Sequence, residues 1–329
     1  MTSDKRIFFS STLFTPFIEE DFLILTRHFR VSKLIAEKLR AFVRIPAEVL
    51  RCDLVFAWFG SIYAGYAVFL AKLLGKKSVI VVAGVDASKD PEINYGIWLS
   101  PWRSRILRYA FRNADQLLPV DPFLEKEIKR LAEYDGHNIS TIAFGFDAIQ
   151  WTAGEAKNDM VLCVASCDNR DRLKKKGIDK LFDAARMLPE VPFQVIGVHE
   201  RILTEVKSLA PANVEIISFV PRSQLLPFYQ KAKVYCQPSF TEGLPNTLCE
   251  AMLCACIPVG TIAGGIPTAI GDAGYLVAYR DQPALVDALK RALASPASHG
   301  LKARARMMSE FTLEKRERSL VAVINTLLS

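Results

Sequence analysis

The sequence predicts an α/β protein made of two doubly wound parallel sheets, and three observations support this prediction. Short apolar runs alternate with amphipathic segments along most of the chain. Such runs are typical of parallel strands, which helices cover on both faces. A polar, irregular segment, WTAGEAKND (151–159), interrupts the alternation near residue 152, and a length of 329 residues leaves room for two domains of medium size.

The composition is that of an ordinary globular protein, with 50% hydrophobic and 23% charged residues, which excludes a disordered chain. The net charge of +7 favours anionic partners, such as nucleotide-sugars, phospholipid surfaces or nucleic acid. Seven cysteines form an odd number without a Cys-x-x-Cys pair, so we expect no disulfide framework. The start, MTSDKRIFFSSTLF, does not resemble a secretory leader. We therefore expect a cytoplasmic location.

The first half of the chain contains several segments that are typical of strands and helices. The apolar runs Arg6–Ser10 and Ser78–Val82 predict buried strands, and a further strand is expected near Phe29–Val31. The spacing of Lys33–Leu39 predicts a helix. His137–Asp147 is expected to form the last strand of the first domain and the loop that leaves it.

The segment Leu54–Ala71 contains no charged residue, so its length alone raises the question of a membrane span. Asp53 precedes it, however, and the Phe-Gly-Ser sequence around Gly60 interrupts it. A strand over 53–58, a glycine turn and a buried helix to about residue 74 fit the usual lengths better.

The second half alternates in the same way and predicts a second sheet. We expect strands over 160–166, 193–198, 214–218 and 234–237, and helices over 178–188, 206–209 and 223–231. A last helix is expected over 313–328.

The most informative stretch runs from Ser239 to Pro267, where turn residues lead directly into a helical apolar pattern. Pro245 suits a position near the helix start, where its missing N–H costs little. The unpaired N–H groups of a helix start favour a phosphate. Glu242 in the loop and Glu250 one turn into the helix suit sugar hydroxyls, so together the features indicate a nucleotide-sugar. The alternative is an ordinary strand–loop–helix unit with surface acids.

The same stretch contains TEGLPNTLCEAM, IPVGT and AGGIP, and with these motifs it resembles the family-4 retaining glycosyltransferases of the GT-B fold. The resemblance implies two Rossmann-like domains facing across a cleft. Residues 1–152 would form the acceptor-side domain and 153–312 the donor-binding domain, with the helix at 313–329 packing back on the first. The implied enzyme is a metal-independent hexosyltransferase. It would move a sugar from a nucleotide diphosphate sugar to a hydroxyl of a glycan or lipid-linked acceptor, with retention of configuration.

The resemblance also implies roles for individual residues. Lys176, which precedes Gly-Ile-Asp in CDNRDRLKKKGID, and either Arg170 or Arg172, with Arg170 preferred, would neutralise the leaving diphosphate. Glu242 would lie beside the transferred sugar. The donor would otherwise be held by Gly243, Leu244, Pro245, Asn246, Thr247 and Glu250, with Val220 near the base.

The first domain departs from the family pattern, because no glycine-rich loop follows its first strand and the loop at 83–96 lacks the usual histidine. Asp86 in that loop is the candidate for a sugar hydroxyl, although it could also cap a turn. These departures motivate an alternative function, that of a non-catalytic nucleotide-sugar binding or scaffold protein.

The segment Ile97–Arg112 combines Trp98 and Trp102 with four arginines. Such a helix could lie on an anionic membrane at the inner face, or it could be a solvated helix with its tryptophans in the core. We expect no essential metal, because no Asp-x-Asp motif follows a strand, and we expect no nucleic-acid partner.

Overall fold

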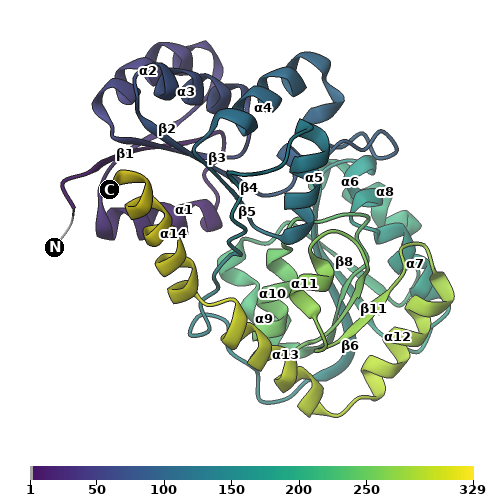
Figure 1. Ribbon diagram of the computed structural model, residues 1–329. Helices are drawn as coiled ribbons and strands as arrows, with labels where there is room; N and C mark the ends of the chain where they lie inside the picture. Colours follow the sequence, from purple (N-terminus) through teal and green to yellow (C-terminus); the bar gives the residue numbers. More distant parts are fainter. Residues whose placement is uncertain (1–2) are drawn as a thin grey trace. The chain divides into compact units, whose positions relative to one another are not determined.

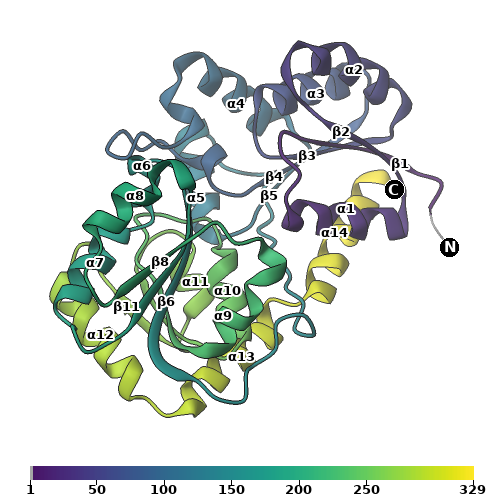
Figure 2. The ribbon, with the colours of Figure 1, turned by 180° about the vertical axis from the view of Figure 1, so that it is seen from behind.

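A computed structural model describes residues 3–329 (Figures 1 and 2). Contacts between elements divide the chain into two units. Unit 1 contains the chain up to Gly145 together with Leu313–Ser329, and unit 2 is Phe146–Thr312. The sequence places the boundary at residue 152, whereas Trp151 packs against Tyr229 and so belongs to unit 2.

Unit 1 is built on a parallel five-stranded sheet with the order β2-β1-β3-β4-β5. Its strands are β1 (Arg6–Ser11), β2 (Arg30–Ile35), β3 (Leu54–Trp58), β4 (Lys77–Val82) and β5 (Gln116–Pro119). Beyond β5, residues 138–142 pair with it through three backbone hydrogen bonds without forming a regular strand. The helix predicted over 33–39 is wrong, because residues 33–35 belong to β2, whose six positions all pair with β1, and the next helix begins only at Lys38.

Helices cover both faces of this sheet. One face carries α2 (Lys38–Arg51), α3 (Ile62–Leu73) and α4 (Pro101–Asn113), which lie side by side in Figure 1, followed by α5 (Pro122–Ala132). The other face carries α1 (Pro16–His28) and α14 (Leu313–Leu328), which contact each other. Short 3₁₀ turns cover Val85–Ala87 and Ile97–Leu99.

The apolar segment at 54–71 therefore forms a strand and a helix, as predicted. Ser61 caps α3 by accepting a hydrogen bond from the Ala64 N–H. Among the residues that the structure describes, no helix has the length and apolar character needed to cross a bilayer.

A buried ion pair joins α14 to the rest of unit 1. The Arg316 guanidinium donates to both carboxylate oxygens of Asp21 in α1, at 2.9 and 2.6 Å, and also to the Ile142 carbonyl at 2.6 Å. The Trp58 indole N–H donates to the same carboxylate at 3.0 Å. Both charged side chains are almost fully buried, so each supplies the counter-charge that the other needs inside the protein.

Breaking this pair should destabilise unit 1 strongly. We expect Arg316→Met to lower the free energy of unfolding by roughly 3–5 kcal/mol, because it leaves the Asp21 carboxylate buried without a counter-charge. Arg318→Met, at an exposed position on the same helix, is the matched control and should cost about 0.5 kcal/mol or less. Denaturant unfolding measures both, and equal losses would contradict the argument.

Unit 2 contains a parallel six-stranded sheet with the order β11-β10-β9-β6-β7-β8. Its strands are β6 (Asn158–Cys167), β7 (Phe193–Val198), β8 (Val214–Ser218), β9 (Ala232–Gln237), β10 (Ile257–Thr261) and β11 (Tyr275–Val277). The two parallel sheets with their helical layers confirm the predicted fold class.

The buried side chains of the central strands in unit 2 point alternately to the two faces of the sheet. Val161, Cys163 and Ala165 of β6 pack with α7, α8 and α12 on one face. On the other face, Tyr235 of β9 reaches Thr247 of α10. The helices and the 3₁₀ turn are α6 (Arg170–Lys175), α7 (Ile178–Arg186), α8 (Glu200–Leu209), η3 (Arg222–Gln224), α9 (Leu226–Lys231), α10 (Asn246–Leu253), α11 (Ile266–Ile270), α12 (Gln282–Ala294) and α13 (Ala297–Glu310).

Candidate functional site

The predicted donor-site residues gather at one edge of the unit 2 sheet. Because the strands are parallel, the carboxyl ends of β6 to β10 all meet at this edge, which is where open α/β sheets bind ligands. Lys176 follows α6, the short helix that comes after β6. Val220 follows β8, and Glu242 lies in the loop between β9 and α10.

The stretch after β9 folds as its sequence predicts, with a loop that opens into α10. Pro245 stands immediately before the first helical residue, and the first intrahelical bond runs from the Cys249 N–H to its carbonyl at 3.2 Å. The N–H groups of the first helical turn therefore have no intrahelical acceptor. Glu250 is the fifth residue of the helix and is almost fully buried.

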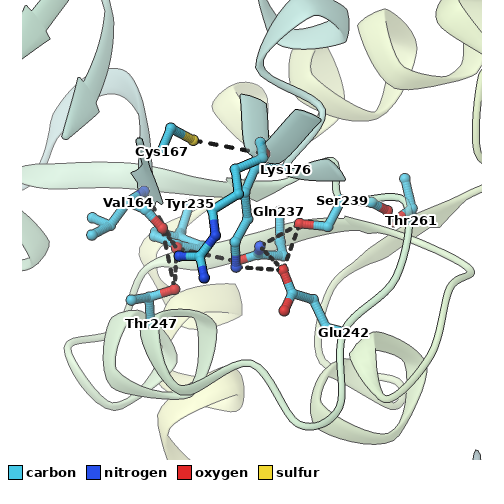
Figure 3. Close-up of polar contacts among 10 residues, drawn as sticks. Val164, Cys167, Lys176, Tyr235, Gln237, Ser239, Glu242, Thr247 and Thr261 are labelled. Carbon is cyan, nitrogen blue, oxygen red and sulfur yellow. Dashed lines mark hydrogen bonds and ion pairs between the residues drawn. The ribbon is translucent and has the colours of Figure 1, made fainter. Parts of the chain in front are cut away.

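Glu242 and Lys176 form the centre of the site (Figure 3). The Lys176 ammonium group lies 2.6 Å from a Glu242 carboxylate oxygen. The Ser239 hydroxyl donates to the same oxygen at 2.9 Å, and the Gln237 amide donates to it at 3.3 Å. The two charged side chains are only 21% and 10% exposed. One carboxylate oxygen thus accepts three hydrogen bonds, one of which comes from a full positive charge.

The charges around this pair set the pKa values of its members. Burial acts to raise the pKa of Glu242, but the charges of Lys176 and Lys175 outweigh it, so the pKa lies below the ordinary value. Burial acts to lower the pKa of Lys176, and Glu242 outweighs it, so that pKa lies above the ordinary value. Burial lowers the pKa of neighbouring Lys175 to about 8. At neutral pH the pair is therefore an ionised Lys⁺–Glu⁻ pair.

Two glycines allow other loops to approach the backbone on either side of Glu242: Gly177, beside Lys176, approaches the residues after β9, and Gly264, in the loop after β10, approaches Glu242 itself. Gly177 has φ +67°, and a Cβ there would lie 1.9 Å from the Pro238 carbonyl oxygen. Gly264 has φ +55°, and a Cβ there would lie 2.0 Å from the Glu242 carbonyl oxygen. Only glycine fits such conformations at such close approach. The Phe240 N–H also donates to the Lys175 carbonyl at 2.7 Å, which fixes the two loops to each other.

Glu250 belongs to a second polar cluster. The Arg222 guanidinium donates to its carboxylate at 2.6 Å, and the Tyr229 hydroxyl donates to its other oxygen at 3.1 Å. Arg222 also lies over the ring of Trp151, 5.3 Å from its centre. Burial raises the pKa of Glu250, and the charge of Arg222 offsets this only in part.

The preferred arginine of the β6–α7 loop does not reach either cluster. Arg170 is 78% exposed and pairs with Glu205 of α8 at 2.6 Å. The reason is local, since Asn169 caps α6 by accepting from the Arg172 N–H and makes Arg170 the first residue of the helix. Arg222, which sequence reasoning missed, is the arginine that meets a site glutamate. Its position just after a strand end, in PRSQ, was the available signal.

The remaining donor-site candidates line the same edge. Thr247 accepts from the Tyr235 hydroxyl at 2.8 Å and donates to the Val164 carbonyl at 3.3 Å. The side-chain oxygen of Asn246 is buried, and it has no hydrogen-bond partner among residues 3–329. Near Val220, the exposed ring of Phe219 lies 5.7 Å from that of His199. A buried acceptor and an exposed aromatic ring at this edge both suit a ligand.

Asp86 lies in unit 1 and is fully buried. Its carboxylate accepts hydrogen bonds from the N–H groups of Gly60, Gly84 and Ala83, at 2.8, 3.0 and 3.2 Å. This is the arrangement of a turn cap, which is one of its two predicted roles. Burial raises the pKa of Asp86 to about 6, against the opposing effect of these donors.

Solved structures share the architecture of this chain. The HepE protein of Anabaena in complex with UDP-glucose superimposes with a TM-score of 0.79 at 15% identity, over 98% of this chain and 99% of that one. Sucrose-phosphate synthase from Thermosynechococcus elongatus gives 0.78 at 15% identity, with coverage of 98% and 99%. At this identity the likeness concerns the fold, which is the GT-B fold of glycosyltransferases.

The sequence comparisons bear on the family. Residues 158–295 match the model described as "Glycosyl transferases group 1". Alpha-maltose-1-phosphate synthase from Mycolicibacterium smegmatis is 26% identical over 76% of this chain and 73% of its own length. A lipopolysaccharide core biosynthesis mannosyltransferase, LpcC of Rhizobium leguminosarum, is 34% identical over 31% of this chain and 30% of its own length. The match over residues 158–295 and these relatives agree with the predicted resemblance to the group 1 glycosyltransferases.

Removing Lys176 should reverse the contribution of Glu242 to the pH dependence of stability. In the wild type the lowered pKa makes ionised Glu242 stabilising above its unfolded pKa of about 4.5, and this contribution is lost as the pH falls. In Lys176→Met, burial dominates and raises the pKa, so stability is lost as the pH rises instead. We expect a deficit that grows from about pH 4 to about pH 7 and reaches roughly 3 kcal/mol.

Melting temperatures of the wild type and Lys176→Met across this pH range measure the deficit. Lys129→Met, which removes a more exposed partner of Glu125, is the control and should show a small deficit. A constant difference between Lys176→Met and wild type would show that Lys176 does not set the ionisation of Glu242.

Asp86 should make unit 1 less stable as the pH rises. Its folded pKa of about 6 lies above its unfolded value of 3.8, so its contribution is complete at low pH and is lost as the pH rises through 6. The shift corresponds to about 3 kcal/mol. The asparagine side chain in Asp86→Asn cannot titrate. As the pH rises, the melting temperature of this variant should therefore increase relative to that of the wild type. Parallel melting curves for the two proteins would rule out this titration.

Proposed function

We propose that the protein is a retaining, metal-independent hexosyltransferase that moves a sugar from a nucleotide diphosphate sugar to an acceptor hydroxyl. The observation that carries the proposal is the Lys176–Glu242 pair at the carboxyl edge of the unit 2 sheet, beside the start of α10. A carboxylate suits sugar hydroxyls, and a buried ammonium group suits a leaving diphosphate.

The contacts of the pair suggest how a donor would bind. In the free protein Lys176 is neutralised by Glu242. A diphosphate at the start of α10 would add negative charge beside Lys176 and Lys175, the second of which has its pKa lowered by burial. We infer that Lys176 shares its hydrogen bonds between Glu242 and the diphosphate, and that both lysines stabilise the charge of the leaving group. The lysines would then supply charge that a divalent cation supplies in other enzymes.

We propose that Glu250 receives the ribose hydroxyls and that the base lies by Phe219 and Val220. The Glu250 carboxylate is almost fully buried in the free protein, which raises its pKa, so further hydrogen-bond donors from a ribose would be favourable. Arg222 and Tyr229 hold this carboxylate in place and are positioning residues. The buried oxygen of Asn246 provides an acceptor for a sugar hydroxyl.

For the acceptor we propose a glycan or a lipid-linked sugar, and for the enzyme a cytoplasmic location. The support for the location is the odd number of cysteines without a Cys-x-x-Cys pair. In unit 1, the loop after β1 contains Thr15, whose hydroxyl oxygen is buried without a hydrogen-bond partner among residues 3–329. Asp86 caps a turn in unit 1. A contact between Asp86 and a hydroxyl of the sugar acceptor stays a prediction.

The turn-cap role of Asp86 and the glycine-free loop after β1 favour a second candidate function, binding of a nucleotide-sugar without transfer. Such a protein would keep the donor clusters of unit 2 and lack an acceptor site in unit 1. The two functions differ in one measurable product, the free nucleoside diphosphate.

The test combines a thermal-shift screen against several nucleotide-sugars with an assay of nucleoside diphosphate release in the presence of glycan and lipid extracts. UDP-sugars come first, because a solved structure of the same fold holds UDP-glucose. For a transferase we expect a raised melting temperature and donor-dependent release. Glu242→Gln should lower the release rate by ~10²–10³-fold, whereas the control Glu127→Gln, on an exposed helix of unit 1, should leave it unchanged.

Each outcome distinguishes the candidates. A thermal shift without release under any condition would favour the binding protein. Release that is equal in wild type and Glu242→Gln would show that the site has been placed wrongly, and the absence of any shift or release would refute both functions.

A further inference from the structure

Helix α2 carries two apolar stripes, only one of which faces the core. Ala41, Ile45 and Val49 are buried against the sheet and α3. Leu39 and Val43 are 81% and 79% exposed, and Leu50, at 60%, continues their line. Spacings of four and seven residues place these three side chains on one side of the helix. Single exposed leucines are common, but an apolar line along a solvent-facing side indicates a partner.

The same side of unit 1 carries the positive charge of the protein. α2, α3 and α4 together hold nine lysines and arginines against one acid, Glu48. Their surplus is eight, against seven for the whole chain, although Arg108 of α4 pairs with Glu133, the residue that follows α5. Arg40, Arg44 and Arg51 flank the apolar line and are exposed. Within residues 3–329 these three arginines form no ion pair, so their charge is directed to solvent.

α3 and α4 extend this surface, which we call the α2–α4 face. Phe69 and Leu73 of α3 and Trp102 of α4 are exposed large apolar side chains. Between the helices lies an open groove of about 470 Å³, whose lining is almost entirely aromatic and aliphatic apart from Arg105. The groove is lined by Phe42, Ile62, Gly65, Tyr66, Phe69, Trp102, Arg105, Ile106 and Tyr109.

We propose that the α2–α4 face binds the surface of an anionic lipid bilayer, with the apolar line and Trp102 entering the interface and the arginines contacting lipid phosphates. Apolar side chains flanked by arginines on one helix face are the pattern of interfacial helices, and basic residues near an anionic leaflet add attraction. A second copy of the chain is a poorer occupant, because a two-fold contact through this face would bring like charges together. The inference does not depend on the proposed function.

The structure also separates the two tryptophans that the sequence groups together. Trp98 is buried, and its indole N–H donates to the Asp86 carbonyl at 2.8 Å. Trp102 is 53% exposed, with Arg103 over its ring at 5.2 Å. The other tryptophans, Trp58 and Trp151, are buried. Of the four tryptophans in the chain, Trp102 alone is exposed, and it reports on this face.

The experiment is sedimentation of the full chain with vesicles of phosphatidylcholine, alone or mixed with phosphatidylglycerol, together with tryptophan fluorescence. We expect binding to the mixed vesicles only, a blue shift of the emission, and quenching by brominated lipid. Trp102→Phe keeps an apolar ring at the surface, so it should retain binding while the blue shift and the quenching disappear.

Two sets of variants test the two parts of the surface. The triple variant Leu39→Asn, Val43→Asn, Leu50→Asn and the triple variant Arg40→Gln, Arg44→Gln, Arg105→Gln should each weaken vesicle binding roughly tenfold or more. The controls lie in unit 2 at exposed positions. The apolar control is the triple variant Ile149→Asn, Leu209→Asn, Leu301→Asn. The basic control is the triple variant Lys207→Gln, Lys231→Gln, Lys290→Gln. Both controls should bind vesicles within about twofold of wild type.

The proposal is overturned if the wild type does not bind mixed vesicles, or if the variants of α2–α4 bind as well as the controls. It is also overturned if the wild type forms a dimer in solution that the Leu39, Val43 and Leu50 substitutions dissociate, because the face would then join two copies. Circular dichroism and melting temperatures of all variants identify any that fail to fold. For such a variant, the Trp102→Phe comparison still decides whether this face meets the lipid.

Discussion

The candidate site depends on one constraint, the contact between the residues that join α6 to α7 and the loop that follows β9. Gly177 lies against the Pro238 carbonyl, and the Phe240 N–H bonds to the Lys175 carbonyl. With the backbones fixed at that distance, Lys176 has a carboxylate, Glu242, within hydrogen-bond reach and little water to solvate either charge. The buried pair is thus a consequence of backbone packing, and a side chain at Gly177 would push the two loops apart and separate its members.

The two site glutamates differ in the balance between burial and charge. Glu242 has two lysines nearby, and their charges hold its pKa below the ordinary value of a glutamate. Glu250 has one arginine nearby, and its pKa lies above that ordinary value. A rigid, ionised carboxylate suits a position beside a sugar whose charge changes during transfer. A carboxylate that lacks solvation suits a neutral diol, because new donors replace missing water. The environments of the two acids therefore agree with the separate roles proposed for them.

The sequence patterns predicted the features that depend on residues close together in the chain. The alternation of apolar runs gave both sheets, and the loop before α10 gave the positions of Glu242 and Glu250. Contacts that form only after folding were beyond that reasoning. β2 extends over residues expected to be helical, because pairing with β1 outweighs local spacing. Arg222 reaches Glu250 from η3, 28 positions away, while an Asn169 cap turns Arg170 outward. Whether Glu242 and Lys176 would touch could not be derived without the loop contact.

The net positive charge of the chain comes from the helices α2, α3 and α4 of unit 1 and not from the donor edge of unit 2. A net charge of +7 is compatible with an anionic donor, yet the positive groups at the donor edge are matched by acids, Lys176 by Glu242 and Arg222 by Glu250. Setting aside the nine basic residues and one acid of α2, α3 and α4 leaves 33 basic and 34 acidic residues elsewhere. Because Debye screening limits exposed charges to about 10 Å, this surplus acts where it lies. The excess charge thus describes a surface of unit 1 and not the donor site.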